Sequence, residues 1–389
     1  MTEPLAEHAN ILFDIFVMLA AAKLFDELCQ RLKQPTVVGG IFAGFLIGPS
    51  VLGWVAPSAG SSMLAEIGVV ILMFSVGLET KLSTILSVGR TALAVAVLGV
   101  VVPFAAGWWL LRFIGESQAE ALFVGTAMVA TSVGITAHVL AEMGVLATRS
   151  ARIILGAAVI DDVLGLLLLA AVSSAAEGPL DWAAVGSTAA AAIAFVIVIA
   201  ALGPWVVART MPFVQRQRAA GWVFSSSLVL CFALAAAADH AGVASIVGAF
   251  LAGMALAEFT SGDPALHRQM HTVGELLVPF FLVTIGMQLK LDVFAQPETL
   301  WLAGVLTLLA IAGKLVGCGV AALHYGWREA VRVGVGMVPR GEVGIIVAQI
   351  GLAAGIVSQS LFGAVLVMVI VTTVIAPPAL KPLFRNVAH

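Results

Sequence analysis

Apolar runs long enough to cross a lipid bilayer follow one another along almost the whole chain. A helix that spans the hydrocarbon core needs about 20 such residues. With 389 residues, of which 61% are hydrophobic and 11% charged, the chain has room for roughly 12 or 13 spans. A soluble fold of this length cannot bury so much apolar surface, so the composition predicts an all-α polytopic membrane protein.

Charges, prolines and glycines divide the sequence into thirteen predicted transmembrane helices. They cover residues 11–29, 36–54, 63–79, 90–113, 119–142, 150–174, 183–207, 222–239, 241–258, 273–289, 299–323, 328–354 and 359–384. When the loops are assigned alternately to the two sides, fourteen Lys and Arg residues fall on one side, and Arg112 and Lys290 fall on the other. Because basic residues concentrate in cytoplasmic loops, the N-terminus is predicted to lie outside and the C-terminus inside the cell.

The sequence resembles itself after a shift of 209 residues. TVVGGIFAGFLIG (36–48) falls on SIVGAFLAGMALA (245–257), and VGTAMV (124–129) falls on VGVGMV (333–338). The first six helices then correspond to the last six, and the seventh is a linker. An odd number of crossings separates equivalent helices, so the two six-helix repeats are predicted to be inverted. Transporters with this symmetry bind substrate near the midplane, between the repeats.

Two predicted helices carry helix-breaking residues at equivalent positions of the repeats. The segments are ATSVGI (130–135) and PRGEVGI (339–345). Paired interruptions of this kind indicate a transporter binding site, although a kinked helix with a packing role is the alternative for either break alone. The first break offers the hydroxyls of Thr131 and Ser132, which are candidate cation ligands.

Ionisable residues within the predicted spans indicate an ion pathway. Asp161 and Asp162 interrupt the apolar run AAVIDDVLGLLLLAAV, and Lys314 lies in AIAGKLVG. Consecutive residues point about 100° apart on a helix, so one aspartate is expected to pair with Lys314 while the other faces a cavity. Arg340 and Glu342 at the second break are predicted to neutralise each other or the helix dipole ends.

This arrangement predicts that a cation and a proton compete for one carboxylate, as cation/proton antiport requires. A carboxylate in a poorly hydrated site exchanges protons near neutral pH, and when ionised it is a hard oxygen ligand for a small cation. Carbonyls and hydroxyls freed at the first break would complete its coordination shell. A cation channel and a symporter are the rival interpretations. The inverted repeat and the absence of a filter-like loop in the sequence argue against a channel. An aspartyl protease is disfavoured, because adjacent aspartates on one helix point apart and the sequence contains no GxGD motif.

Several motifs resemble those of the bacterial monovalent cation:proton antiporter-2 family, and within it the NapA-type sodium/proton antiporters. They are GVVILMFSVGLE, MVATSVGITAHVLAEMG, ILGAAVIDDVLGLLLLA, IGMQLKLD, AIAGKLVG and GVGMVPRGEVGIIVA, and they extend over essentially the whole chain. The resemblance implies an NhaA/NapA-like fold of thirteen helices with two broken crossing helices, and a homodimer in the bacterial inner membrane. The dimer domain would comprise 1–85 and 216–295, the core ion-transport domain 86–176 and 296–389, and the linker helix 177–215.

The resemblance also implies roles for the buried charges. Asp162 would be the principal ion-binding carboxylate, and Asp161 its neighbour in a switchable salt bridge with Lys314. A Na⁺ site is therefore expected at Asp162, Asp161 and Thr131. The implied activity is electrogenic exchange of cytoplasmic Na⁺ for external H⁺ by an elevator mechanism, with Li⁺ or K⁺ as alternative cations. We expect no enzymatic activity, no cofactor besides the transported ions, no nucleic-acid partner and no nucleotide-binding regulatory domain.

Overall fold

The computed structural model describes residues 3–32, 34–81, 83, 85, 87–177, 182–216, 221–260, 264–288 and 297–385, and this described part contains helices but no strands. The helices are α1 (Glu3–Arg31), α2 (Thr36–Ile47), α3 (Ala59–Leu78), α5 (Gly89–Phe113), α6 (Gln118–Ala127), α7 (Val133–Glu142), α8 (Arg149–Glu177), α9 (Trp182–Gln215), α10 (Trp222–His240), α11 (Ser245–Thr260), α12 (Pro264–Met287), α13 (Pro297–Ala322), α14 (Trp327–Gly336), α15 (Glu342–Ala353) and α16 (Gln359–Phe384), with a short 3₁₀ turn at Leu323–Tyr325.

Two of the predicted helices are each interrupted in the structure. The span predicted at 119–142 is divided into α6 and α7, and the span predicted at 328–354 into α14 and α15. Both predicted breaks are therefore confirmed. Within the described residues, seven helices are long and apolar enough to cross a membrane, and the broken pairs consist of shorter pieces.

Some helix ends differ from the sequence prediction. α2 was expected to extend to residue 54, but it ends at Ile47, because Gly48 adopts an extended conformation and Pro49 follows it. In contrast, α1 begins at Glu3 and α9 continues to Gln215, both beyond the apolar runs that defined the predicted spans. Hydropathy marks the part of a helix suited to lipid and does not mark where its hydrogen bonding stops.

Glycine contacts show the internal symmetry. A Cβ atom on Gly44 or on Gly286 would lie 1.9 Å from a main-chain oxygen of the facing helix, so the backbones of α2 and α12 touch there. The same holds for Gly77 on α3 and Gly253 on α11, at 2.4 and 2.3 Å. The 209-residue shift carries α2 onto α11 and α3 onto α12. The contact of α2 with α12 is therefore equivalent to the contact of α11 with α3, as expected if the two repeats are related by symmetry.

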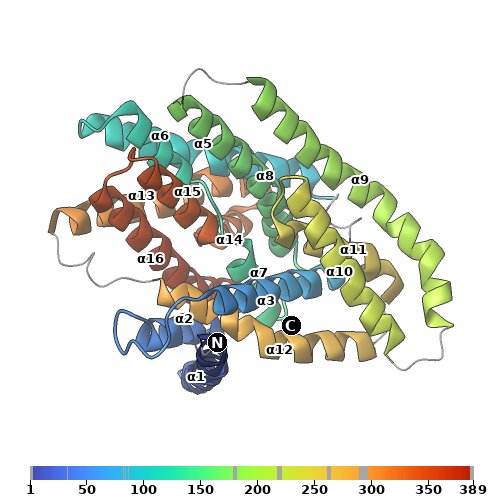
Figure 1. The fold of residues 1–389 in the computed structure, drawn as a ribbon. Helices are drawn as coiled ribbons and strands as arrows, with labels where there is room; N and C mark the ends of the chain where they lie inside the picture. Colours follow the sequence, from blue (N-terminus) through green and yellow to red (C-terminus); the bar gives the residue numbers. More distant parts are fainter. Residues whose placement is uncertain are drawn as a thin grey trace.

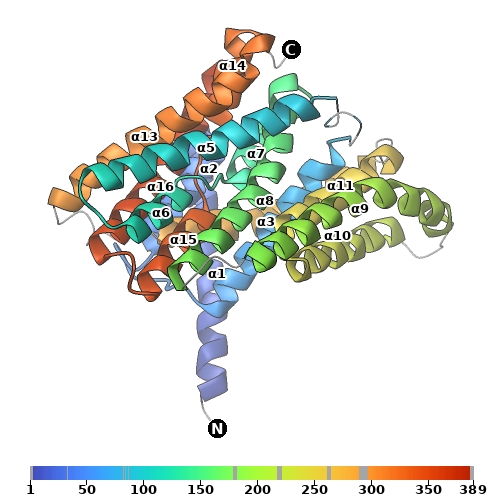
Figure 2. The ribbon, with the colours of Figure 1, turned by 90° about the horizontal axis from the view of Figure 1, so that it is seen from above.

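The helices form adjoining groups around buried apolar clusters. One cluster joins α1, α2 and α12, and another joins α5, α6, α8, α13, α15 and α16. A third and larger cluster connects these groups through α3, α7, α8 and α11. Helix α9 runs along the outside (Figure 1). The N and C labels are close in Figure 1 but lie at opposite faces in Figure 2, where α1 projects from one face and α14 from the other.

Candidate functional site

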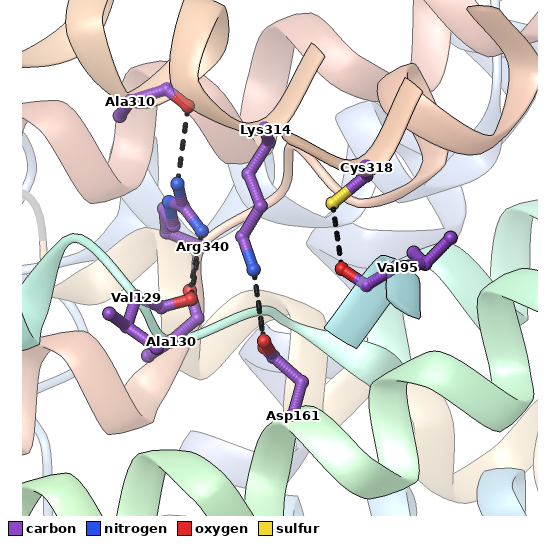
Figure 3. A network of polar contacts seen from close by, with 8 residues as sticks. All are labelled: Val95, Val129, Ala130, Asp161, Ala310, Lys314, Cys318 and Arg340. Carbon is purple, nitrogen blue, oxygen red and sulfur yellow. Dashed lines mark hydrogen bonds and ion pairs between the residues drawn. The ribbon is translucent and has the colours of Figure 1, made fainter. Parts of the chain in front are cut away.

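A buried ion pair joins α8 to α13. Lys314 Nζ lies 3.1 Å from Asp161 Oδ1 and 3.3 Å from Oδ2, and the two side chains are 0% and 1% exposed. Figure 3 shows the ammonium and the carboxylate pointing directly at each other. This is the pairing of Lys314 with an aspartate that the sequence predicts. Two charges so deeply buried are tolerated because each neutralises the other, and removing either partner is strongly destabilising.

Asp162 has different surroundings from Asp161. It is the next residue on α8, so its side chain points about 100° away from that of Asp161. It is only partly buried, whereas Asp161 is fully buried. The adjacent aspartates therefore differ: Asp161 is held in a buried ion pair, whereas Asp162 is a partly exposed residue whose Oδ2 atom is itself buried.

The two helix breaks lie against each other. The main-chain N–H of Ser132, at the first break, donates to the carbonyl of Pro339, at the second, over 2.8 Å. The hydroxyl of Thr136 on α7 donates to the carbonyl of Gly336 at the end of α14, also over 2.8 Å. Backbone groups freed by a break within a membrane must find partners inside the protein, and here each break supplies partners to the other.

Arg340 connects the second break to the first. Its Nη1 donates to the carbonyls of Val129 and Ala130 at 3.0 and 3.1 Å, and its Nη2 donates to that of Ala310 at 3.2 Å (Figure 3). The side chain is fully buried. Val129 and Ala130 follow the C-terminal end of α6, where the helix dipole is negative, so the guanidinium lies where a positive charge is favoured.

This geometry supports one of the two predicted roles of Arg340, compensation of a dipole end. The other role was neutralisation by Glu342. Glu342 is the first residue of α15, and its side chain lies outside the described part of the structure.

The hydroxyls of Thr131 and Ser132 are buried at the first break. The two residues are 5% and 4% exposed, and within the described residues neither Thr131 Oγ1 nor Ser132 Oγ has a hydrogen-bond partner. A buried polar atom without a partner costs free energy and calls for an explanation. Both oxygens are therefore candidate ligands for a bound ion.

Two threonines contribute to the site in ways that the sequence analysis missed. Thr136 bonds to Gly336 across the breaks, and Thr373 on α16 donates its hydroxyl to the carbonyl of Arg340. A threonine within a helix usually bonds to a carbonyl of its own helix, so nothing in the sequence distinguishes these two from the others.

A cavity of about 350 Å³ lies between α1, α2, α3, α7 and α12. Its lining includes seven ionisable residues: Lys23, Asp26, Glu79, His138, Glu142, His271 and Glu275. The two aspartates of α8 are not among the lining residues. At one edge of the cavity the carboxylate of Glu142, at the end of α7, accepts hydrogen bonds from the N–H and hydroxyl of Thr36, at the start of α2.

Comparison with known proteins gives a consistent result. Residues 15–386 match a family model described as the transmembrane sodium/hydrogen exchanger. The chain is 36% identical to the Na⁺/H⁺-K⁺ antiporter GerN of Bacillus cereus over 376 residues, which cover 96% of each chain. It is 35% identical to the high-affinity Na⁺/H⁺ antiporter NhaS3 of Synechocystis, covering 97% of this chain and 90% of that one.

The fold also matches a solved structure. The sodium proton antiporter of Methanocaldococcus jannaschii at pH 8 superposes with a TM-score of 0.67 at 14% identity, covering 97% of both chains. An electron-microscopy structure of the same antiporter gives a TM-score of 0.70 at 16% identity. These findings confirm the antiporter family that the motifs indicate, while the closer likeness to the NapA type stays a prediction. The chain is a multi-pass membrane protein that belongs to the sodium/hydrogen exchanger family.

Proposed function

We propose that this protein is a secondary active antiporter that exchanges cytoplasmic Na⁺ for external H⁺. The observation that carries the proposal is the buried Asp161–Lys314 pair beside a partly exposed Asp162, together with two helix breaks that hydrogen-bond to each other. In such a site, Asp161 is paired with Lys314, and Asp162 can bind an ion. The similarity to the antiporters GerN and NhaS3 supports Na⁺ and H⁺ as substrates, and GerN, a Na⁺/H⁺-K⁺ antiporter, adds K⁺ as the second candidate cation.

The proposed ion site consists of oxygen atoms only. Asp162 binds either a proton or the cation, and the hydroxyls of Thr131 and Ser132 contribute ligands at the break. Carboxylate and hydroxyl oxygens suit a small hard cation such as Na⁺. When the cation also engages Asp161, Lys314 loses its partner. An unpaired ammonium in a medium of low dielectric constant is costly, so Lys314 releases its proton.

This order of cation binding and proton release makes the exchange electrogenic. Asp162 gives up one proton and Lys314 another, against one monovalent cation, and net charge crosses the membrane in each cycle. Exchange should therefore respond to the membrane potential, since moving one elementary charge through 100 mV is worth about 2.3 kcal/mol.

We propose thirteen spans in the bacterial inner membrane, with the N-terminus outside and the C-terminus in the cytoplasm. The positions of the chain ends at opposite faces in Figure 2 support an odd number of crossings. The basic loops support the orientation. The cavity lined by Asp26 and Glu142 would then open toward the cytoplasm and admit cations, because its lining carries more acidic than basic groups.

Transport would follow from movement of one part of the molecule against the other. In the proposed elevator mechanism, the core ion-transport domain (86–176 and 296–389) moves against a dimer domain (1–85 and 216–295), with 177–215 as the linker. The glycine contacts of α2 with α12 and of α3 with α11 support a rigid dimer domain. We further propose that two copies assemble as a homodimer.

The proposed exchange is tested in proteoliposomes. An imposed pH gradient should drive Na⁺ uptake that saturates with Na⁺ concentration and reverses when the gradient is reversed. Li⁺ and K⁺ measured in parallel would define the cation preference. Flux that is independent of the pH gradient and does not saturate would identify a channel and would overturn the proposal.

A further inference from the structure

Two adjacent threonines on α16 use their hydroxyls differently. Thr372 and Thr373 are both fully buried. Thr372 Oγ1 donates to the carbonyls of Met368 and Val369, at 2.8 and 2.9 Å within its own helix, which is the usual arrangement. Thr373 Oγ1 instead donates to the carbonyl of Arg340, which belongs to the second break.

The carbonyl of Arg340 needs this partner. Arg340 lies between the end of α14 at Gly336 and the start of α15 at Glu342, outside both helices. A buried carbonyl that no helix satisfies is costly unless another group donates to it. Thr373 therefore fixes the main chain of Arg340, while the side chain of the same residue extends to the first break.

A chain of contacts leads from Thr373 to the proposed ligands. Thr373 holds the carbonyl of Arg340, and the guanidinium of Arg340 holds the carbonyls of Val129 and Ala130. The next residue along the chain is Thr131, whose buried hydroxyl has no hydrogen-bond partner among the described residues. The position of this hydroxyl thus depends on where Arg340 is held.

We propose that Thr373 is a positioning residue for the cation site. Its hydroxyl sets the placement of Arg340, and through it the placement of the oxygens at the first break. It contacts neither carboxylate of α8 in the hydrogen bonds that the structure gives for it. This inference rests on the proposed antiport function and on Thr131 and Ser132 as ligands. It predicts that removing the hydroxyl weakens Na⁺ binding more than it slows turnover.

The test compares Thr373→Val with Thr372→Val. Both substitutions remove one buried hydroxyl from neighbouring positions of the same helix, but only the first removes a contact with the break. Thr373→Val should raise the KM for Na⁺ about three- to tenfold, the effect of one lost hydrogen bond, with a smaller change in kcat. Thr372→Val should keep the wild-type KM, and Thr373→Ser should restore it.

A role limited to stability gives a different result. Thr373→Val would then lower the melting temperature of the purified protein and leave the KM for Na⁺ unchanged, which would overturn the inference. An equal rise in KM for Thr372→Val would also overturn it. If Thr373→Val fails to fold, Thr373→Cys replaces it. The thiol is a weak donor, so an intermediate KM is expected, and a wild-type KM would contradict the proposal. Wild-type protein without cation-driven proton exchange would refute the proposed function itself.

Discussion

The two helix breaks occupy equivalent positions in the two repeats, yet their polar groups are satisfied in opposite ways. A shift of 209 residues places Thr131 on Arg340. The Arg340 side chain donates to three carbonyls, and its own carbonyl accepts from Thr373. The hydroxyl of Thr131 has no such partner in the described part of the chain. The main chains of both breaks are thus held by contacts between them, but only the first break retains side-chain hydroxyls for a ligand.

The same contrast extends to the charges. The shift places Asp161 on Ile370, and Lys314 falls on Ala105. The first repeat supplies the carboxylates and the free hydroxyls, while the second supplies the buried cations. The repeats share a backbone arrangement, as the paired glycine contacts show, but the site exists only where they meet. A repeat therefore need not duplicate its chemistry for its two copies to build one site between them.

The largest effect on stability is expected at the second break. Arg340→Met removes the hydrogen bonds to three buried carbonyls while it preserves much of the side-chain volume. Each bond from a charged group is worth about 1.5–3 kcal/mol, so the loss of three should cost at least about 4.5 kcal/mol. Thermal unfolding of the purified protein should show a clearly lower melting temperature. A wild-type melting temperature would show that the second break is not held by Arg340.

Lys314 tests the charge balance between the repeats. In Lys314→Gln, the buried Asp161 loses its cationic partner and the second proton carrier is absent. Exchange should stop or become electroneutral. Lys314→Arg is the matched control, because it keeps the positive charge but an arginine does not release its proton in proteins. Charge movement on a solid-supported membrane measures the outcome. Voltage-sensitive exchange in both variants would show that Lys314 does not carry the second proton and would assign that role to Asp161.

The smallest effect on stability is expected at the first break. Thr131→Val removes a buried hydroxyl that makes no hydrogen bond within the described structure, so the free energy of unfolding should not fall. The KM for Na⁺ should nevertheless rise, because a cation ligand is lost. Thermal unfolding and Na⁺-dependent transport are measured on the same preparation. A marked loss of stability with an unchanged KM would make Thr131 a structural residue and would remove the contrast between the breaks.

The sequence predicts those parts of the molecule that follow from strong local constraints. The second break is predictable because Pro339 and Gly341 interrupt an apolar run, whereas residues 128–132 of the first break contain neither proline nor glycine and are located chiefly by their match to the second repeat. The pairing of Lys314 with an aspartate of α8 is predictable because a lysine buried in the membrane needs a carboxylate and few are available, while the choice of Asp161 comes from the family resemblance. The domain boundaries, the dimer and the residue roles stay proposals.

Other features depend on how helices that are distant in sequence meet. The sequence predicts that Arg340 neutralises Glu342 or the dipole ends at the breaks, but it does not predict which groups the guanidinium contacts, and in the structure these are the carbonyls of residues 129, 130 and 310. The role of Thr373 is hidden for the same reason. Its sequence context is almost identical to that of Thr372. The two hydroxyls have different acceptors only because the main chain of the second break passes beside Thr373.

The central claim is that Na⁺ and a proton compete for Asp162, and proton release on Na⁺ binding tests it most directly. Purified protein in weakly buffered detergent solution is mixed with NaCl or with choline chloride, and a pH indicator records the protons released. The account predicts release with Na⁺ and none with choline. It also predicts that Asp162→Asn, which changes the carboxylate but little of the side-chain shape, loses the release while it stays folded. Undiminished proton release from folded Asp162→Asn would contradict the account.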